Sequence, residues 1–160
     1  MSRSMDPVVQ VVTNGEEPCI HITDIENLAG SGWLDVETVS TIHDIYFENV
    51  PVKPGDLVVV AAGPHNRRAV YEGWPEAAYQ FRKGKSGADL VMAEFFENIQ
   101  DVEIFSHVFL ASGDSDLAPV TSKAAAHGID VTVVTMNGKK SFALNAFPEI
   151  RLDSSFGGGL

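Results

Sequence analysis

The segment Ser-Gly-Asp-Ser-Asp at residues 112–116 places two carboxylates directly after an apolar run. The run is Val108–Leu110, and the segment is followed by Leu117–Val120, which is typical of the start of a helix. In open α/β sheets, ligands bind at the carboxyl edge, where the chain passes from strand to helix. Asp114 and Asp116 are therefore expected where carboxylates can do chemistry.

Two further aspartates lie in comparable positions. Asp24 lies among apolar residues near the end of the run Cys19–Ile25, where a carboxylate is costly unless something compensates for its desolvation. Asp89 comes four residues after Lys85. Hard divalent cations such as Mg²⁺ prefer a few carboxylate oxygens and keep several waters. A pair of aspartates on one loop with a third from a neighbouring strand would supply such ligands.

Each of these acids also has a purely structural interpretation. Asp24 could cap a turn through its side-chain oxygen. Asp114 or Asp116 could be the N-cap of the helix that follows, since aspartate is favoured there. Asp89 opens a predicted helix, and the positive helix terminus stabilises an acid at that position. The sequence leaves these alternatives open.

The elements that must position these acids follow from an alternation of apolar runs with segments of helical periodicity. The alternation predicts an α/β fold, a three-layer sandwich with a mostly parallel central sheet of five or six strands covered on both faces. The predicted strands are Cys19–Ile25, Leu57–Ala62, Ala77–Phe81, Ile104–Leu110, Ile129–Thr135 and Glu149–Leu152. The predicted helices are Val36–Asn49, His65–Gly73, Lys85–Asn98, Ser115–His127 and Lys139–Ala146.

The length of 160 residues fits one domain. We expect it to span residues 18–153, preceded by a flexible lead or edge strand at 1–17 and followed by a flexible tail at 154–160. No apolar run approaches the ~20 residues of a membrane span and no secretory segment is evident, so the expected location is cytoplasmic with no membrane partner. Cys19 is the only cysteine, which excludes an internal disulfide and a zinc site built on several thiolates.

The charge is strongly negative but unevenly distributed. A formal net charge of −11 argues against non-specific binding to nucleic acid, because phosphate neutralisation by Lys and Arg supplies most of that affinity. Five of the 11 basic residues nevertheless form one stretch, namely Arg67, Arg68, Arg82, Lys83 and Lys85. This pattern favours a protein that admits a polyanion at one place, although solvated surface charge explains it equally well.

Three motifs in this order resemble the NYN domains of the PIN-like nuclease superfamily. They are an apolar strand ending in Asp24 with Asn27 three residues on, a lysine-containing segment before Asp89, and the Ser-Gly-Asp-Ser-Asp segment at 112–116. The resemblance covers about residues 18–152. The last segment is fairly specific to the family, whereas the first two gain weight only from their order and spacing.

The resemblance implies a metal-dependent ribonuclease, expected to be endonucleolytic, that hydrolyses RNA at an acidic Mg²⁺ or Mn²⁺ site. Asp114 and Asp24 would be inner ligands, and Asp116 and Asp89 would hold waters or a second ion. Asn27 would position the substrate or the strand end. The remaining expected substrate contacts, most of them to phosphate, are Ser112, Lys85, Arg82, Arg67 and Arg68.

Aromatic residues could stack on RNA bases, and Trp74, Tyr71 and Tyr79 are the candidates near the basic stretch. Packing in the core or at its rim is the alternative for each of them. The five histidines show no metal-ligand spacing. Ser112 and Ser115 lack a paired base, which makes nucleophilic catalysis improbable.

One position departs from the family pattern. Family members often carry a second acid in the helix that Asp89 opens, but Phe95 occupies this position here. The sequence therefore does not decide whether the site holds one metal ion or two. The alternative function is therefore a catalytically weak domain that binds RNA or a partner protein. A phosphatase or a receiver domain is the least favoured alternative. Its paired acids would follow an early strand, whereas the pair here follows the fourth predicted strand. An acidic monomer and a symmetric homodimer both fit the sequence.

Overall fold

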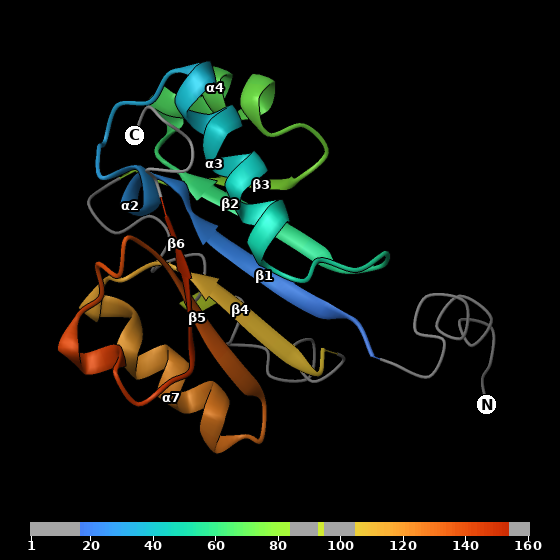
Figure 1. Ribbon diagram of the computed structural model, residues 1–160, viewed down its shortest axis with the longest axis vertical. Helices are drawn as coiled ribbons and strands as arrows, with labels where there is room; N and C mark the ends of the chain where they lie inside the picture. The colour runs from blue at the N-terminus through green and yellow to red at the C-terminus, as the bar shows by residue number, and fades with distance from the viewer. Residues whose placement is uncertain (1–16, 84–92, 95–104, 154–160) are drawn as a thin grey trace.

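The central feature of the fold is one six-stranded, all-parallel sheet, shown in Figure 1. The structure is a computed structural model, and it describes residues 17–83, 93–94 and 105–153. The strand order is β3-β2-β1-β4-β5-β6. The expected α/β three-layer architecture is confirmed, and the sheet is entirely rather than mostly parallel.

The strands are β1 Cys19–Asp24, β2 Leu57–Ala62, β3 Ala78–Phe81, β4 His107–Ala111, β5 Asp130–Met136 and β6 Glu149–Leu152. The helices are α2 Ile25–Ala29, α3 Val36–Asn49, α4 Arg67–Gly73 and α7 Ala118–Ala126. Three short 3-10 turns complete the description, η1 Pro64–Asn66, η2 Ser115–Leu117 and η3 Phe142–Leu144.

Three predicted elements match these bounds, namely Leu57–Ala62, Glu149–Leu152 and Val36–Asn49, and most of the others differ by one to three residues at an end. The first strand ends one residue earlier than predicted, because the chain turns into the short helix α2 at Ile25. The sequence did not predict this helix. The predicted helix over 139–146 is wrong, because only the turn η3 forms there. The predicted lead, the tail and nearly all of the helix Lys85–Asn98 lie outside the described residues.

Each face of the sheet carries its own core. Helices α3 and α4 cover one face and α7 covers the other (Figure 1). Alternation along β1 separates the two cores, since Ile20 and Ile22 pack on the α7 side and Cys19 packs on the α3 side. Both faces are buried, which explains why the parallel strands read as continuous apolar runs.

Helix α3 buries a stripe with a period of about 3.6 residues, as its sequence predicts. The buried positions are Val39, Ile42, Ile45 and Tyr46, whereas Val36, which was expected on the stripe, is 37% exposed. Helix α7 ends as predicted, with Gly128 at a positive φ of 84° that favours glycine.

A buried polar chain crosses the amino end of β1. The His21 ring lies between the Tyr46 hydroxyl, 2.7 Å from Nδ1, and an Asp56 carboxylate oxygen, 3.0 Å from Nε2. Burial lowers the pKa of His21, so the neutral ring donates from Nε2 to Asp56 and accepts from the tyrosine. The histidine is thereby a satisfied core residue.

The strand order reverses between β1 and β4. Strand β1 pairs with β2 on one side and with β4 on the other, and the later strands continue outward from there. Crossovers leave to opposite faces at such a point and open a crevice at the carboxyl edge.

The described residues contain no helix long and apolar enough to span a membrane.

Candidate functional site

Asp24 and the segment 112–114 meet at this crevice. The register pairs Thr23 with Ala111 across β1 and β4, so Asp24 and Ser112 follow on adjacent strands. The Ser112 hydroxyl donates to Asp24 Oδ2 at 3.1 Å. The two motifs are 88 residues apart in the sequence, and the parallel register brings them into contact.

A second hydrogen bond joins the same two motifs. The Gly113 N–H donates to Asn27 Oδ1 at 2.9 Å, and the Asp114 N–H donates to Ser112 Oγ at 3.2 Å. Asn27 therefore fixes the strand end, one of the two roles expected for it. Ser112 is fully buried and holds Asp24 and Asp114, so its expected contact with substrate is corrected to a positioning role.

The structural interpretations of the acids also hold in part. Asp24 Oδ1 accepts from the Asn27 N–H and is the N-cap of α2, and Asp114 Oδ1 accepts from the Asp116 N–H and is the N-cap of η2. Each cap uses one oxygen. No partner from the described residues hydrogen-bonds the second oxygen of Asp114, which remains open to a ligand.

These residues line a pocket of about 450 Å³ at the carboxyl edge. Its walls come from the end of β1, helix α2, the loop at 30–32, the loop after β4 and the loop after β5. The lining residues are Asp24, Glu26, Asn27, Gly30, Ser31, Gly32, Asp114 and Lys139. Three carboxylates and one lysine thus share a hollow large enough for a phosphate with its neighbouring groups.

The environment of the pocket destabilises the charged form of Asp24. Burial raises the pKa of Asp24 to about 6, and the charges of Glu26 and Asp114 act in the same direction. The hydrogen bonds from Asn27 and Ser112 oppose this shift. Because Asp114 is close enough to disfavour the Asp24 carboxylate, a divalent cation between them would relieve both the desolvation and the repulsion.

Glu26 plays a different part from the two aspartates. Its Oε2 accepts from the Gly63 N–H and from the Asn66 side-chain amide, both at 2.7 Å. It therefore ties α2 to the loop after β2. Neither Glu26 nor Lys139 was expected in the site, although the sequence did single out Asp24 and Asn27 on either side of Glu26.

Lys139 reaches the pocket through a close backbone contact. A side chain at Gly113 would place its Cβ 2.0 Å from the Lys139 carbonyl oxygen, and the Ser141 N–H donates to the Gly113 carbonyl at 2.8 Å. Only a glycine lets the loop after β5 lie against the loop after β4. The neighbouring Lys140 instead forms an ion pair with Glu149 at 2.9 Å.

The predicted basic contacts lie elsewhere on the molecule. Arg67 lies over the Phe81 ring at 5.2 Å, Arg68 pairs with Glu72 on α4, and Arg82 pairs with Glu94 at 2.7 Å. None of the three lines the acidic pocket. Arg82 does follow β3 at the carboxyl edge, as expected of the stretch.

The remaining predicted ligands are only partly described. Asp116 is exposed at the start of η2 and is not among the pocket residues, so its metal role stays a prediction. Asp89, Lys85 and Phe95 lie outside the described residues. Within the described ranges, no group of three or more His, Cys, Asp or Glu side chains is arranged to hold a metal ion.

A solved structure supports the fold that creates this crevice. A protein of unknown function from Vibrio parahaemolyticus RIMD 2210633, VPA0982, has a crystal structure similar to this chain with a TM-score of 0.54 and 15% identity. The similarity covers 86% of this chain and 92% of that one. No protein-family model and no curated protein sequence matches this chain. The likeness therefore concerns the fold alone.

The aromatic candidates from the sequence are not at the site. Trp74 is buried at 1% exposure, and the Tyr79 hydroxyl donates to the Trp74 carbonyl at 2.5 Å, so packing is the correct interpretation for both. Tyr71 is half-exposed but packs edge-on against Tyr79 and Phe81.

Proposed function

We propose that this protein is a metal-dependent ribonuclease that cleaves RNA internally at the acidic pocket. One observation carries the proposal: the half-buried carboxylates of Asp24 and Asp114 line one hollow at the point where the strand order reverses. Oxygen ligands of this kind fit Mg²⁺ or Mn²⁺, which are bound through one or two carboxylates with waters completing the shell.

In this proposal Asp24 and Asp114 hold the cation, with the expected roles of Asp116 and Asp89 added around them. A bound Mg²⁺ or Mn²⁺ supplies polarisation of a phosphoryl oxygen and a bound water of lowered pKa. Ser112 and Asn27 keep the two loops in register, so that the carboxylates are positioned before substrate arrives. Lys139 contributes a positive charge for a phosphate oxygen.

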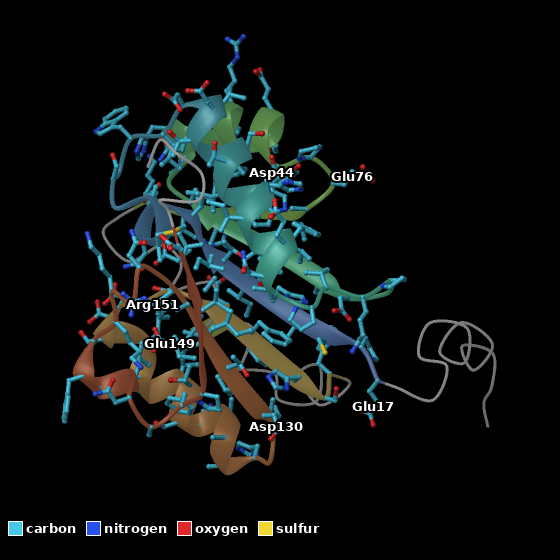
Figure 2. All side chains as sticks on the ribbon, in the orientation of Figure 1. Glu17, Asp44, Glu76, Asp130, Glu149 and Arg151 are labelled. Atoms are coloured by element: carbon cyan, nitrogen blue, oxygen red, sulfur yellow. The ribbon has the colours of Figure 1, made fainter. Side chains whose placement is uncertain are left out.

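Cleavage of end-labelled single-stranded and hairpin RNA tests the proposal. The wild type should cut with Mn²⁺ or Mg²⁺ and should not cut in EDTA. Asp114→Asn should reduce the rate by about 100-fold or more, since metal assistance is worth several kcal/mol. Asp130→Asn is a matched control, because this exposed acid begins β5 at the opposite edge of the sheet (Figure 2). Cleavage that survives both EDTA and Asp114→Asn would rule out the mechanism.

A second candidate is an RNA-binding or protein-interaction module that no longer cleaves. It is favoured by Phe95 at the position of an expected acid. It is also favoured because the described residues contain no group of three or more His, Cys, Asp or Glu side chains arranged to hold a metal ion. RNA binding without cleavage under any metal condition would support it. For either function we propose a cytoplasmic protein, where RNA is available, that acts as a monomer or a symmetric dimer.

A further inference from the structure

Two large aromatic side chains are exposed to solvent close in sequence to residues that line the acidic pocket. Trp33 is 77% exposed and Phe142 is 87% exposed, the highest values for large hydrophobic residues in the described part of the chain. Trp33 follows the pocket wall formed by Gly30 to Gly32, and Phe142 lies three residues after Lys139. Burial of such a side chain stabilises a fold, and these two side chains contribute little of that stabilisation because they stay exposed.

Trp33 is held by a rigid loop. The buried Asn66 side chain donates to the Gly32 carbonyl at 3.0 Å and accepts from the Leu34 N–H at 3.0 Å. The backbone is therefore fixed on both sides of Trp33. Its indole contacts the His65 ring at a centroid distance of 4.4 Å and stays otherwise open. The fold thus fixes an exposed aromatic beside the pocket.

Phe142 belongs to the loop after β5, the other loop that contributes to the pocket. Its neighbour Ser141 is bonded through its N–H to the Gly113 carbonyl, and Leu144 anchors the turn η3 in the core. Phe142 therefore lies between two anchored residues in the sequence, and its ring stays exposed. The loop that carries Phe142 is the one that also brings Lys139 to the pocket.

Lys139 is a basic side chain beside both hollows at this edge. It lines the acidic pocket and also a smaller adjoining hollow of about 180 Å³, which shares Asn27 and Gly30 with it. No described residue forms an ion pair with Lys139, in contrast to Lys140. The loops at the carboxyl edge therefore carry an acidic pocket, a lysine that lines it, and two exposed aromatic side chains.

We propose that single-stranded RNA crosses this edge, with bases stacked on Trp33 and Phe142 and a phosphate held by Lys139 over the acidic pocket. The proposal rests on the proposed function and names its substrate class. Stacking requires an exposed base face, which unpaired nucleotides offer and duplexes do not. A chain of net charge −11 is also poorly suited to a duplex, whose binding depends on many phosphate contacts.

Binding of a short fluorescent RNA, measured in EDTA and again with Ca²⁺, tests this inference. Alanine at Trp33 or Phe142 should weaken the affinity for single-stranded RNA about 5- to 100-fold each, the effect of losing one stacked base. Tyr71→Ala is the matched control and should leave the affinity unchanged. Trp33→Phe should retain most of the affinity, which separates stacking from a folding defect. Far-UV circular dichroism checks that each variant is folded.

Two further readouts sharpen the test. Indole fluorescence should be quenched by single-stranded RNA in the wild type but not in Trp33→Phe, which keeps only the buried Trp74. Lys139→Ala should reduce the slope of log affinity against log salt by about 0.7, the value for one phosphate contact on a single strand.

Two results would overturn the inference while leaving the ribonuclease untouched. One is metal-dependent cleavage with Trp33→Ala and Phe142→Ala binding RNA as tightly as wild type, and the other is metal-dependent cleavage with equal or tighter binding of a hairpin of the same composition. Tighter binding of the DNA oligonucleotide of the same sequence, or saturable binding of an unstructured peptide but of no RNA, would overturn the inference and count against the ribonuclease as well. Conversely, RNA binding that depends on both aromatics without any cleavage would support stacking and reject the ribonuclease.

Discussion

Replacing Asp24 by asparagine should make the metal-free protein more stable and abolish its cleavage of RNA. Burial raises the pKa of Asp24 from 3.8 to about 6, which corresponds to about 3 kcal/mol of destabilisation at neutral pH. Asparagine carries no charge and can keep the contact, since the Ser112 hydroxyl can accept as well as donate. The expected gain is about 6–12 °C in the melting temperature.

The pH dependence of this gain identifies its cause. A folded pKa above the unfolded value gives stability that is present below about pH 4 and lost as the pH rises through about 6. The advantage of Asp24→Asn should therefore be full at pH 7.5 and vanish near pH 4. Chemical denaturation of both proteins across this range measures it. A variant that is less stable than wild type at pH 7.5 would contradict the assigned origin of the shift.

The same substitution should lower the rate of RNA cleavage by about 1,000-fold or more, because metal assistance worth several kcal/mol is lost. Asp24 would thus reduce stability and support activity at once, a combination typical of functional sites. Addition of Mn²⁺ should raise the melting temperature of the wild type and leave that of Asp24→Asn unchanged. Single-turnover cleavage assays measure the rate, and Asp130→Asn again serves as the control.

Replacing Gly113 by alanine should have the largest effect on stability. The added Cβ would lie 2.0 Å from the Lys139 carbonyl oxygen and 3.0 Å from the Lys140 Cα, so the backbone of one loop must move. Overpacking costs about 1–3 kcal/mol and occasionally more, and a clash with backbone atoms is expected at the upper end of this range. The displaced loop would also take Lys139 out of the pocket, so RNA cleavage should fall with stability.

Gly32→Ala is the matched control for this substitution. No atom lies within 4 Å of the Cβ that alanine would add at Gly32, and its φ is not positive. Its free energy of unfolding should stay within about 1 kcal/mol of wild type. Urea denaturation compares the two variants. Equal stability of Gly113→Ala and Gly32→Ala would show that the loops after β4 and β5 are not in contact.

The fold was predictable from the sequence because the parallel strands are buried on both faces. Leu57–Ala62 is an uninterrupted apolar run, and its bounds as β2 match the prediction. The short helix α2 escaped prediction because Ile25 and Leu28 continue the apolar pattern of β1, and five residues do not establish a helical period. A helix was predicted over 139–146 although only the turn η3 forms, because Leu144 alone among the apolar residues there is buried and no apolar face packs on the sheet.

The candidate site was predictable only where it depends on strand ends. Asp24 and Asp114 were expected together because adjacent parallel strands end at one edge. Lys139 could not be predicted, because its place depends on the backbone contact with Gly113, which no local pattern reveals. The exposed aromatic residues Trp33 and Phe142 were also missed. Trp74 was chosen as a stacking candidate because it lies near the basic stretch in the sequence, but residue type alone does not distinguish the exposed Trp33 from the buried Trp74.

Binding of Mn²⁺ to the acidic pocket is the property on which the proposed activity depends most directly. Titration calorimetry at pH 7.5 with wild type, Asp24→Asn and Asp130→Asn measures it. We expect saturable binding by wild type and Asp130→Asn, and affinity at least about 10-fold weaker in Asp24→Asn, which loses one charged ligand. Equal affinity of all three proteins, or no saturable binding by wild type, would contradict a metal site at Asp24 and Asp114.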